Sequence, residues 1–145
     1  DSSNLGIMGA SMGALSALNT AMEYPELFGF VGCISTHWIG IKPSEYVLLP
    51  FNSLLNRKPV IADEATIEAI IKYSAINASR LKDKKVYFDH GTERLDYFYS
   101  EPQARINQIF DSYQIEYMFK ANEGHGHEPK YFGSRFIDAL QYLTN

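Results

Sequence analysis

A serine between two glycines, followed by an acidic loop and then a histidine-rich loop, is the part of this sequence that could do chemistry. Ser11 lies within residues 9–13, which have the pattern G-x-S-x-G. Segment 89–96 carries three carboxylates, and segment 123–129 carries two histidines. A serine hydroxyl is a weak nucleophile until a base takes its proton, and a histidine base needs an acid to orient it. The chain order serine, acid, histidine therefore predicts nucleophilic catalysis.

The residues around Ser11 predict a strand, a tight turn and a helix. Apolar residues 5–8 precede the turn, and the helix formers 14–18 follow it. This context is expected to place Ser11 at the tip of the turn in a strained backbone conformation, with its side chain clear of both elements. A Cβ at either Gly9 or Gly13 is expected to collide where the strand and the helix cross. The alternative is that these small residues only allow close packing.

Further along the chain, strand-like runs alternate with amphipathic helical runs. Strands are predicted at 28–35, 86–88 and 115–119, and helices to about 24, over 63–78, from 102 and over 132–143. This alternation predicts an α/β fold with a parallel sheet, formed by residues 1–145 as a single domain. Segment 40–62 has no clear period and is a candidate cap or lid, or an ordinary surface excursion.

The composition excludes several classes of partner. The 145 residues carry a net charge of -4 without a basic run, which argues against nucleic acid. No apolar run reaches the roughly 20 residues of a membrane span. The single cysteine, Cys33, cannot form an internal disulfide and is expected in the core. His125, His127 and Glu128 could suggest a metal, but no further ligand cluster supports one, and we expect neither a metal nor a cofactor.

Three stretches resemble the putative-esterase family of α/β-hydrolases, which includes feruloyl esterases, S-formylglutathione hydrolases and mycolyltransferases. Segment 9–13 followed by 24–28 resembles the family's nucleophile turn, helix and "Pro-x-x-Phe" entry to the next strand. Segment 89–96 resembles a "D-x-G-T-E-x-L-D" stretch, and 124–127 resembles "G-x-x-H" before the last helix. The resemblance implies an α/β-hydrolase fold, a parallel sheet with flanking helices lacking the N-terminal strands.

The resemblance also selects among the candidate site residues. From the residues alone, Asp89, Glu93 and Asp96 could each be the acid, and His125 and His127 could each be the base. By resemblance the acid is Asp96 and the base is His127.

These assignments imply a serine hydrolase that cleaves carboxylic esters through an acyl-enzyme. His127 would take the proton of Ser11, Asp96 would hold the histidine tautomer, and the backbone N–H of Met12 would donate to the oxyanion. The second oxyanion donor comes, in this fold, from a loop upstream of the nucleophile strand. The alternatives are an acyltransferase of the same family and a non-catalytic or incomplete module.

Aromatic residues near the predicted site suggest where a substrate would bind. His37, Trp38 and Tyr97 are candidates to contact a small-molecule or carbohydrate-linked ester, and ordinary packing is the alternative. A domain seldom opens on its nucleophile strand, and an uncovered apolar strand pairs with something. We therefore expect strand 5–8 to pair with an N-terminal half or with a second copy of the chain.

Overall fold

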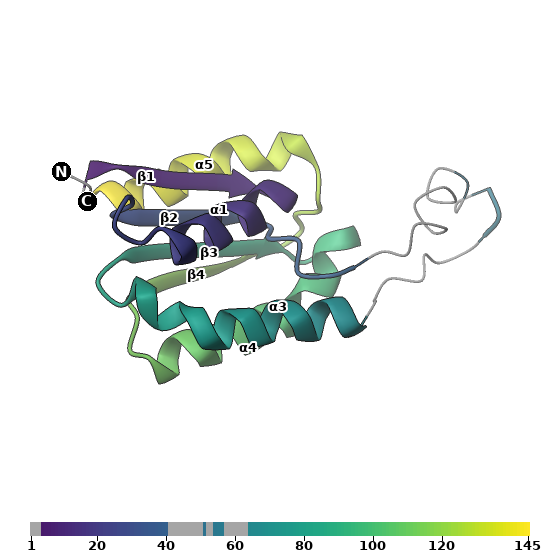
Figure 1. The fold of residues 1–145 in the computed structure, drawn as a ribbon. Coiled ribbons are helices and arrows are strands. Elements are labelled where there is room, and N and C mark those ends of the chain that lie inside the picture. The colour runs from purple at the N-terminus through teal and green to yellow at the C-terminus, as the bar shows by residue number, and fades with distance from the viewer. Residues whose placement is uncertain (1–3, 41–50, 52–53, 57–63) are drawn as a thin grey trace.

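The computed structural model describes residues 4–40, 51, 54–56 and 64–145, and these residues form one sheet of parallel strands. The strands are β1 (Gly6–Ala10), β2 (Phe30–Ile34), β3 (Lys85–Gly91) and β4 (Tyr117–Asn122). They are hydrogen-bonded in the order β1-β2-β3-β4, so spatial order follows chain order (Figure 1). Parallel neighbours require crossover connections, and helices supply them here.

Helices cover both faces of this sheet. The helices are α1 (Met12–Glu23), α3 (Glu64–Asn77), α4 (Ser100–Ser112) and α5 (Pro129–Thr144), with short 3-10 turns η3 (Ala78–Leu81) and η4 (Arg94–Tyr99). Figure 1 shows α5 on one face and α1, α3 and α4 on the other. Within the described ranges, no helix combines the length and apolar character needed to cross a membrane.

The core divides into two clusters because strand side chains alternate between faces. In β3, Val86 and Phe88 enter the larger cluster beneath α1, α3 and α4. Tyr87 enters the smaller cluster beneath α5, together with Ala139 and Leu143 of that helix. The face under α5 also holds polar side chains that bear on the site described below.

The predicted α/β fold with a parallel sheet is confirmed, with small shifts at element ends. Helix α4 begins at Ser100, ahead of Pro102, because a proline in the first turn lacks only an N–H that would be unpaired there. Strand β4 begins at Tyr117 because the N–H of Ile115 still bonds the carbonyl of Phe110, closing the turn after α4. Nearly all of the candidate lid at 40–62 lies outside the described residues. Pairing of β1 with another strand stays a prediction.

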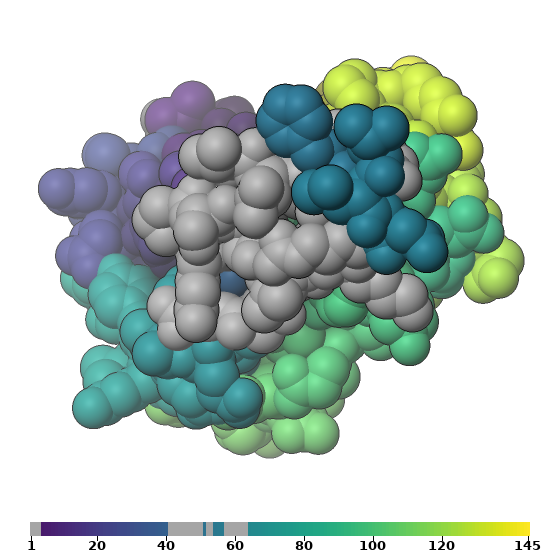
Figure 2. Space-filling model, turned by 90° about the vertical axis from the view of Figure 1, so that its right-hand side faces the viewer, coloured from purple at the N-terminus to yellow at the C-terminus, as the bar shows by residue number. Residues whose placement is uncertain are grey.

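Parallel strands bring their carboxyl ends to one edge of the sheet. Ser11 follows β1 there, Ser35 follows β2, and the acidic segment 89–96 begins within the end of β3 and continues beyond it. Figure 2 views the molecule from this side, with β1 and α1 in purple, α3 and α4 in teal and green, and α5 in yellow. Ligand crevices of α/β sheets lie at this edge.

Candidate active site

Ser11 occupies a strained turn between β1 and α1. Its backbone has φ 57° and ψ -124°, in the left-handed half of the map that non-glycine residues seldom adopt. A Cβ at Gly9 would lie 2.3 Å from the carbonyl carbon of Gly13, so a side chain is excluded there. The expectation for Gly13 is wrong, because a Cβ at Gly13 would meet no atom of the described residues within 4 Å. Of the two glycines, only Gly9 is required by the crossing of strand and helix.

His127 joins Ser11 to Asp96 through hydrogen bonds at both ring nitrogens. Its Nε2 lies 2.7 Å from Ser11 Oγ, and its Nδ1 lies 2.6 Å from Asp96 Oδ1. An ionised carboxylate only accepts hydrogen bonds, so Nδ1 carries the proton and Nε2 is left to accept that of the Ser11 hydroxyl. The three side chains form the arrangement in which a serine is activated as a nucleophile.

Asp96 is fully buried, and its carboxylate is satisfied by donors from three directions. Besides His127 at Oδ1, its Oδ2 accepts the Ser35 hydroxyl at 2.5 Å and the Gly91 N–H at 2.6 Å. Burial alone would raise the pKa of Asp96. The hydrogen bonds from His127, Ser35 and Gly91 outweigh it and hold that pKa below its usual value. The carboxylate is therefore ionised at neutral pH.

The other candidate acids lie elsewhere. Asp89 is buried at the end of β3, where its carboxylate pairs with the guanidinium of Arg135 and accepts the phenol of Tyr87. The side chain of Glu93 is exposed, and its backbone N–H donates to the carbonyl of His125. Asp96 is the candidate that the structure brings to His127.

His125, the other histidine of this loop, holds two loop backbones together. The ring of His125 stacks on Tyr131 with 4.3 Å between centroids. Its carbonyl passes so close to β3 that a Cβ at Gly91 would lie 2.0 Å from it. This approach holds the loop after β4 against the loop after β3, and therefore His127 against Asp96.

The N-terminus of α1 supplies backbone donors beside Ser11. The first hydrogen bonds into this turn run from Ala14 N and Leu15 N to Ser11 O. The N–H groups of Met12 and Gly13 precede them, and groups at these positions have no partner within their own helix. Such an N–H can donate to an anion beside Ser11, and the role of Met12 as an oxyanion donor stays a prediction.

His37 is the predicted substrate contact that lies nearest to this arrangement. Its N–H donates to Ser11 O at 3.2 Å, and its Nδ1 lies 2.7 Å from the phenol oxygen of Tyr99. Tyr99 in turn meets the ring of His127 edge-on at 5.5 Å. Burial, with the nearby charge of His127, lowers the pKa of His37, so that this ring is neutral at pH 7.

Trp38 and Tyr97 are the other two residues predicted to contact a substrate. Trp38 is buried in the core against Phe88 and donates to Gln103, which favours its packing role over substrate contact. Tyr97 is exposed and lines a hollow of about 270 Å³ that includes His90 but none of Ser11, Asp96 and His127. Its contact with a substrate stays a prediction.

Ser35 and Arg135 also lie at the site, although the sequence did not predict them there. One signal could have found Arg135, which falls on the apolar, sheet-facing side of α5 at helical spacing from Ala139 and Leu143. A charge at such a position needs a buried partner. Ser35 has no comparable signal in the sequence.

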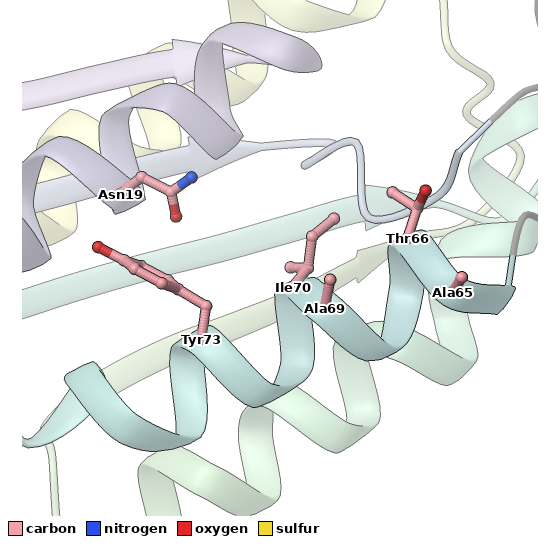
Figure 3. Close-up of a pocket in the computed structure, with 6 residues that line it drawn as sticks. All are labelled: Asn19, Ala65, Thr66, Ala69, Ile70 and Tyr73. Atoms are coloured by element: carbon pink, nitrogen blue, oxygen red, sulfur yellow. The ribbon is translucent and has the colours of Figure 1, made fainter.

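A groove of about 400 Å³ lies apart from this arrangement, between α1 and α3. Figure 3 shows its lining residues, which are Asn19, Ala65, Thr66, Ala69, Ile70 and Tyr73. None of them contributes to the hydrogen-bonded series at Ser11. Over the residues that the structure describes, no group of three or more histidine, cysteine, aspartate or glutamate side chains is arranged to hold a metal ion.

Comparisons with known proteins show the family and the fold of this chain. The model of the family described as "Putative esterase" matches residues 1–143. No curated protein matches the sequence. Among solved structures, a ferulic acid esterase is similar with a TM-score of 0.69 and 21% identity, over 99% of this chain and 52% of its own. The enterochelin esterase of Shigella flexneri is similar with a TM-score of 0.58 and 18% identity, over 98% of this chain and 31% of its own.

A third similar structure is the monoacylglycerol lipase of Paleococcus ferrophilus, with a TM-score of 0.59 and 14% identity, over 95% of this chain and 67% of its own. At these identities the structural likeness shows the fold, which is the α/β-hydrolase fold. The chain spans about half the length of the ferulic acid esterase that it matches.

Proposed function

Because this chain belongs to the putative esterase family, we propose that it hydrolyses carboxylic esters with Ser11 as nucleophile, His127 as base and Asp96 as orienting acid. The observation that carries the proposal is the unbroken series of hydrogen bonds from Ser11 Oγ through His127 to Asp96, at 2.7 and 2.6 Å. Such a series lowers the cost of removing the serine proton at neutral pH.

The proposed reaction has two halves. Ser11 Oγ bonds to the ester carbonyl carbon while its proton passes to His127 Nε2, and the Met12 N–H donates to the oxyanion. The tetrahedral intermediate then expels the alcohol, which takes the proton from His127, and an acyl-serine remains. Water attacks that acyl group in the same manner, releases the carboxylic acid and restores Ser11.

The oxyanion hole sets a condition on this activity. In α/β-hydrolases the second donor comes from a loop upstream of the nucleophile strand. Losing one such donor costs on the order of a hundred- to a thousand-fold in turnover. We therefore propose that this chain supplies the nucleophile, the base and the acid. Its turnover should be slow when Met12 is the only oxyanion donor.

The substrate is proposed to be a small-molecule or carbohydrate-linked ester. The family assignment and the likeness to the ferulic acid esterase support an ester of this kind. A neutral His37 beside Ser11 supports a polar contact to the alcohol or acyl group through Nε2, because its Nδ1 is already hydrogen-bonded to Tyr99.

The test is hydrolysis of p-nitrophenyl acetate by the wild-type chain, Ser11→Ala and Ser16→Ala. Ser16 is an exposed serine on the same helix and serves as the matched control. We expect Ser11→Ala to fall to the background rate and Ser16→Ala to match the wild type. A fluorophosphonate should label Ser11 and should not label Ser11→Ala.

Two outcomes would change the proposal. A folded wild-type chain with the rate of Ser11→Ala and with unlabelled Ser11 would contradict it and favour the non-catalytic module. Transfer of the acetyl group to an added alcohol in preference to water would favour the acyltransferase.

A further inference from the structure

Behind Asp96 lies a buried polar group that the proposed reaction does not use. It consists of Ser35 at the end of β2, Asp89 at the end of β3 and Arg135 on α5, each at most 1% exposed. Burying a charged network is costly unless its members are paired. Its position beside the triad acid points to a role in the reaction.

We propose that Ser35 and Arg135 are positioning residues that fix which oxygen of Asp96 faces His127. Arg135 Nη2 donates to Ser35 Oγ at 2.5 Å, and Ser35 Oγ donates to Asp96 Oδ2 at 2.5 Å. We refer to these contacts as the Arg135–Ser35–Asp96 series. The inference rests on the proposed function of Asp96 and His127.

The direction of this series follows from the chemistry of its members. A guanidinium has no acceptor, so the Ser35 oxygen can only accept from Arg135. The Ser35 hydroxyl proton is thereby turned toward Asp96. Together with the Gly91 N–H it occupies Oδ2, which leaves Oδ1 for His127 Nδ1.

Asp89 determines what Arg135 can do. Nε and Nη2 of Arg135 both donate to the Asp89 carboxylate, while Nη1 lies 3.6 Å from Asp96 Oδ2 and has no hydrogen-bond partner among the described residues. Arg135 and Asp89 thus neutralise each other, and Asp96 keeps its negative charge. That charge is available to the imidazolium that forms when His127 takes the Ser11 proton.

The backbone of Ser35 supports a role in positioning. Its φ of 44° lies in the left-handed region, and its N–H donates to Asp89 at both the carbonyl and Oδ1. A non-glycine residue held there is strained, and the surrounding contacts must enforce it. The strained backbone of Ser35 directs its hydroxyl toward Asp96.

The test compares Ser35→Ala with Ser74→Ala in the 145-residue chain. Ser74 is a buried serine on α3 whose hydroxyl has no hydrogen-bond partner in the described part of the chain, which makes it a matched control. The first readout is the second-order rate constant for labelling of Ser11 by diisopropyl fluorophosphate, in which the serine oxygen displaces fluoride. The second is the pH titration of the Asp96 carboxyl carbon by NMR, in protein labelled with carbon-13 aspartate.

We expect Ser35→Ala to label about 10- to 100-fold more slowly, because small misplacements of catalytic groups have effects of this size. The pKa of Asp96 should rise, because it loses one donor while His127, Gly91 and Arg135 remain around it. Ser74→Ala should change neither readout. A wild-type labelling rate, or an unchanged Asp96 titration in folded Ser35→Ala, would overturn the proposal.

Two other experimental results would also be decisive. If the wild-type chain folds but Ser11 is not labelled, the proposed function fails, and the Asp96 titration alone decides the positioning role. If Ser35→Ala does not fold, Arg135→Lys replaces it, because lysine keeps the charge but lacks the planar fork that reaches Asp89 and Ser35 together. An unchanged Asp96 titration in Arg135→Lys would then overturn the proposal.

Discussion

Ser11 and Ser35 both have a positive φ angle, at matching positions after neighbouring strands. Their φ angles are 57° and 44°, and they follow β1 and β2 at the same register. Ser11 meets Nε2 of His127, and Ser35 donates to the carboxylate of Asp96. His127 and Asp96 are therefore each hydrogen-bonded to a serine with a strained backbone, and the expected cost of each strained conformation is about 1–3 kcal/mol.

Replacement of the two buried aspartates should separate their roles. Asp96→Asn is expected to lower kcat by about 10³- to 10⁴-fold, because an amide turned toward Nδ1 stabilises the wrong histidine tautomer. KM should change little. Steady-state hydrolysis of p-nitrophenyl acetate measures both constants.

Asp89→Asn is the matched comparison. It leaves the buried guanidinium of Arg135 without its carboxylate, which should lower the free energy of unfolding by roughly 3–5 kcal/mol. Its effect on kcat should be smaller than that of Asp96→Asn. Equal losses of kcat in two folded variants would contradict the assignment of the acid.

The two glycines beside Ser11 should respond differently to alanine. Gly9→Ala places a Cβ against the Gly13 backbone and should destabilise the chain by several kcal/mol or prevent folding. The Cβ of Gly13→Ala would meet no atom of the described residues within 4 Å, so this variant should leave the free energy of unfolding within about 1 kcal/mol of the wild type, because helical alanine is favoured over glycine. Urea unfolding followed by circular dichroism measures both, and equal destabilisation would contradict the contrast.

Stability should depend on pH through Asp96. Because folding lowers its pKa, the ionised carboxylate stabilises the fold above its unfolded value of about 4, and this contribution is lost as pH falls through the folded pKa. The difference in unfolding free energy between wild type and Asp96→Asn should be constant from pH 7 to about 5. It should shrink on further acidification. A difference that grows toward acid pH would contradict the direction of the shift.

The single thiol should be inert in the folded chain. Cys33 is fully buried in β2, and burial raises the pKa of its thiol well above the usual range. Thiolate is the reactive form, so dithiobis(nitrobenzoate) should react only on unfolding. Reaction with folded protein at the rate seen in urea would contradict this burial.

The sequence alone predicts those features that have a local pattern. Apolar strands, amphipathic helices and the G-x-S-x-G turn are all readable over short windows, and they predicted the α/β fold and the place of Ser11. The choice of Asp96 and His127 came from resemblance, since Asp89 and His125 fit the residue chemistry equally well. Only the folded structure distinguishes the two aspartates. The side chain of Asp89 pairs with Arg135 of α5, whereas that of Asp96 contacts His127.

The remaining site residues could not be predicted because their roles arise from contacts between distant elements. Ser35 becomes important only because β2 ends beside Asp96 and beneath Arg135. Trp38 looks like a cleft residue by its place after a strand, yet it turns into the core against Phe88. No short window of sequence encodes such directions.

The distances along the chain between partners have a consequence for folding. The hydrogen bond from Ser11 to His127 spans 116 residues, and that from Arg135 to Ser35 spans 100. Contacts of such long range form late, after the loops between them have closed. The reactivity of Ser11 should therefore appear only in the last step of folding. A partly folded chain that already has its helices should still have an unreactive serine.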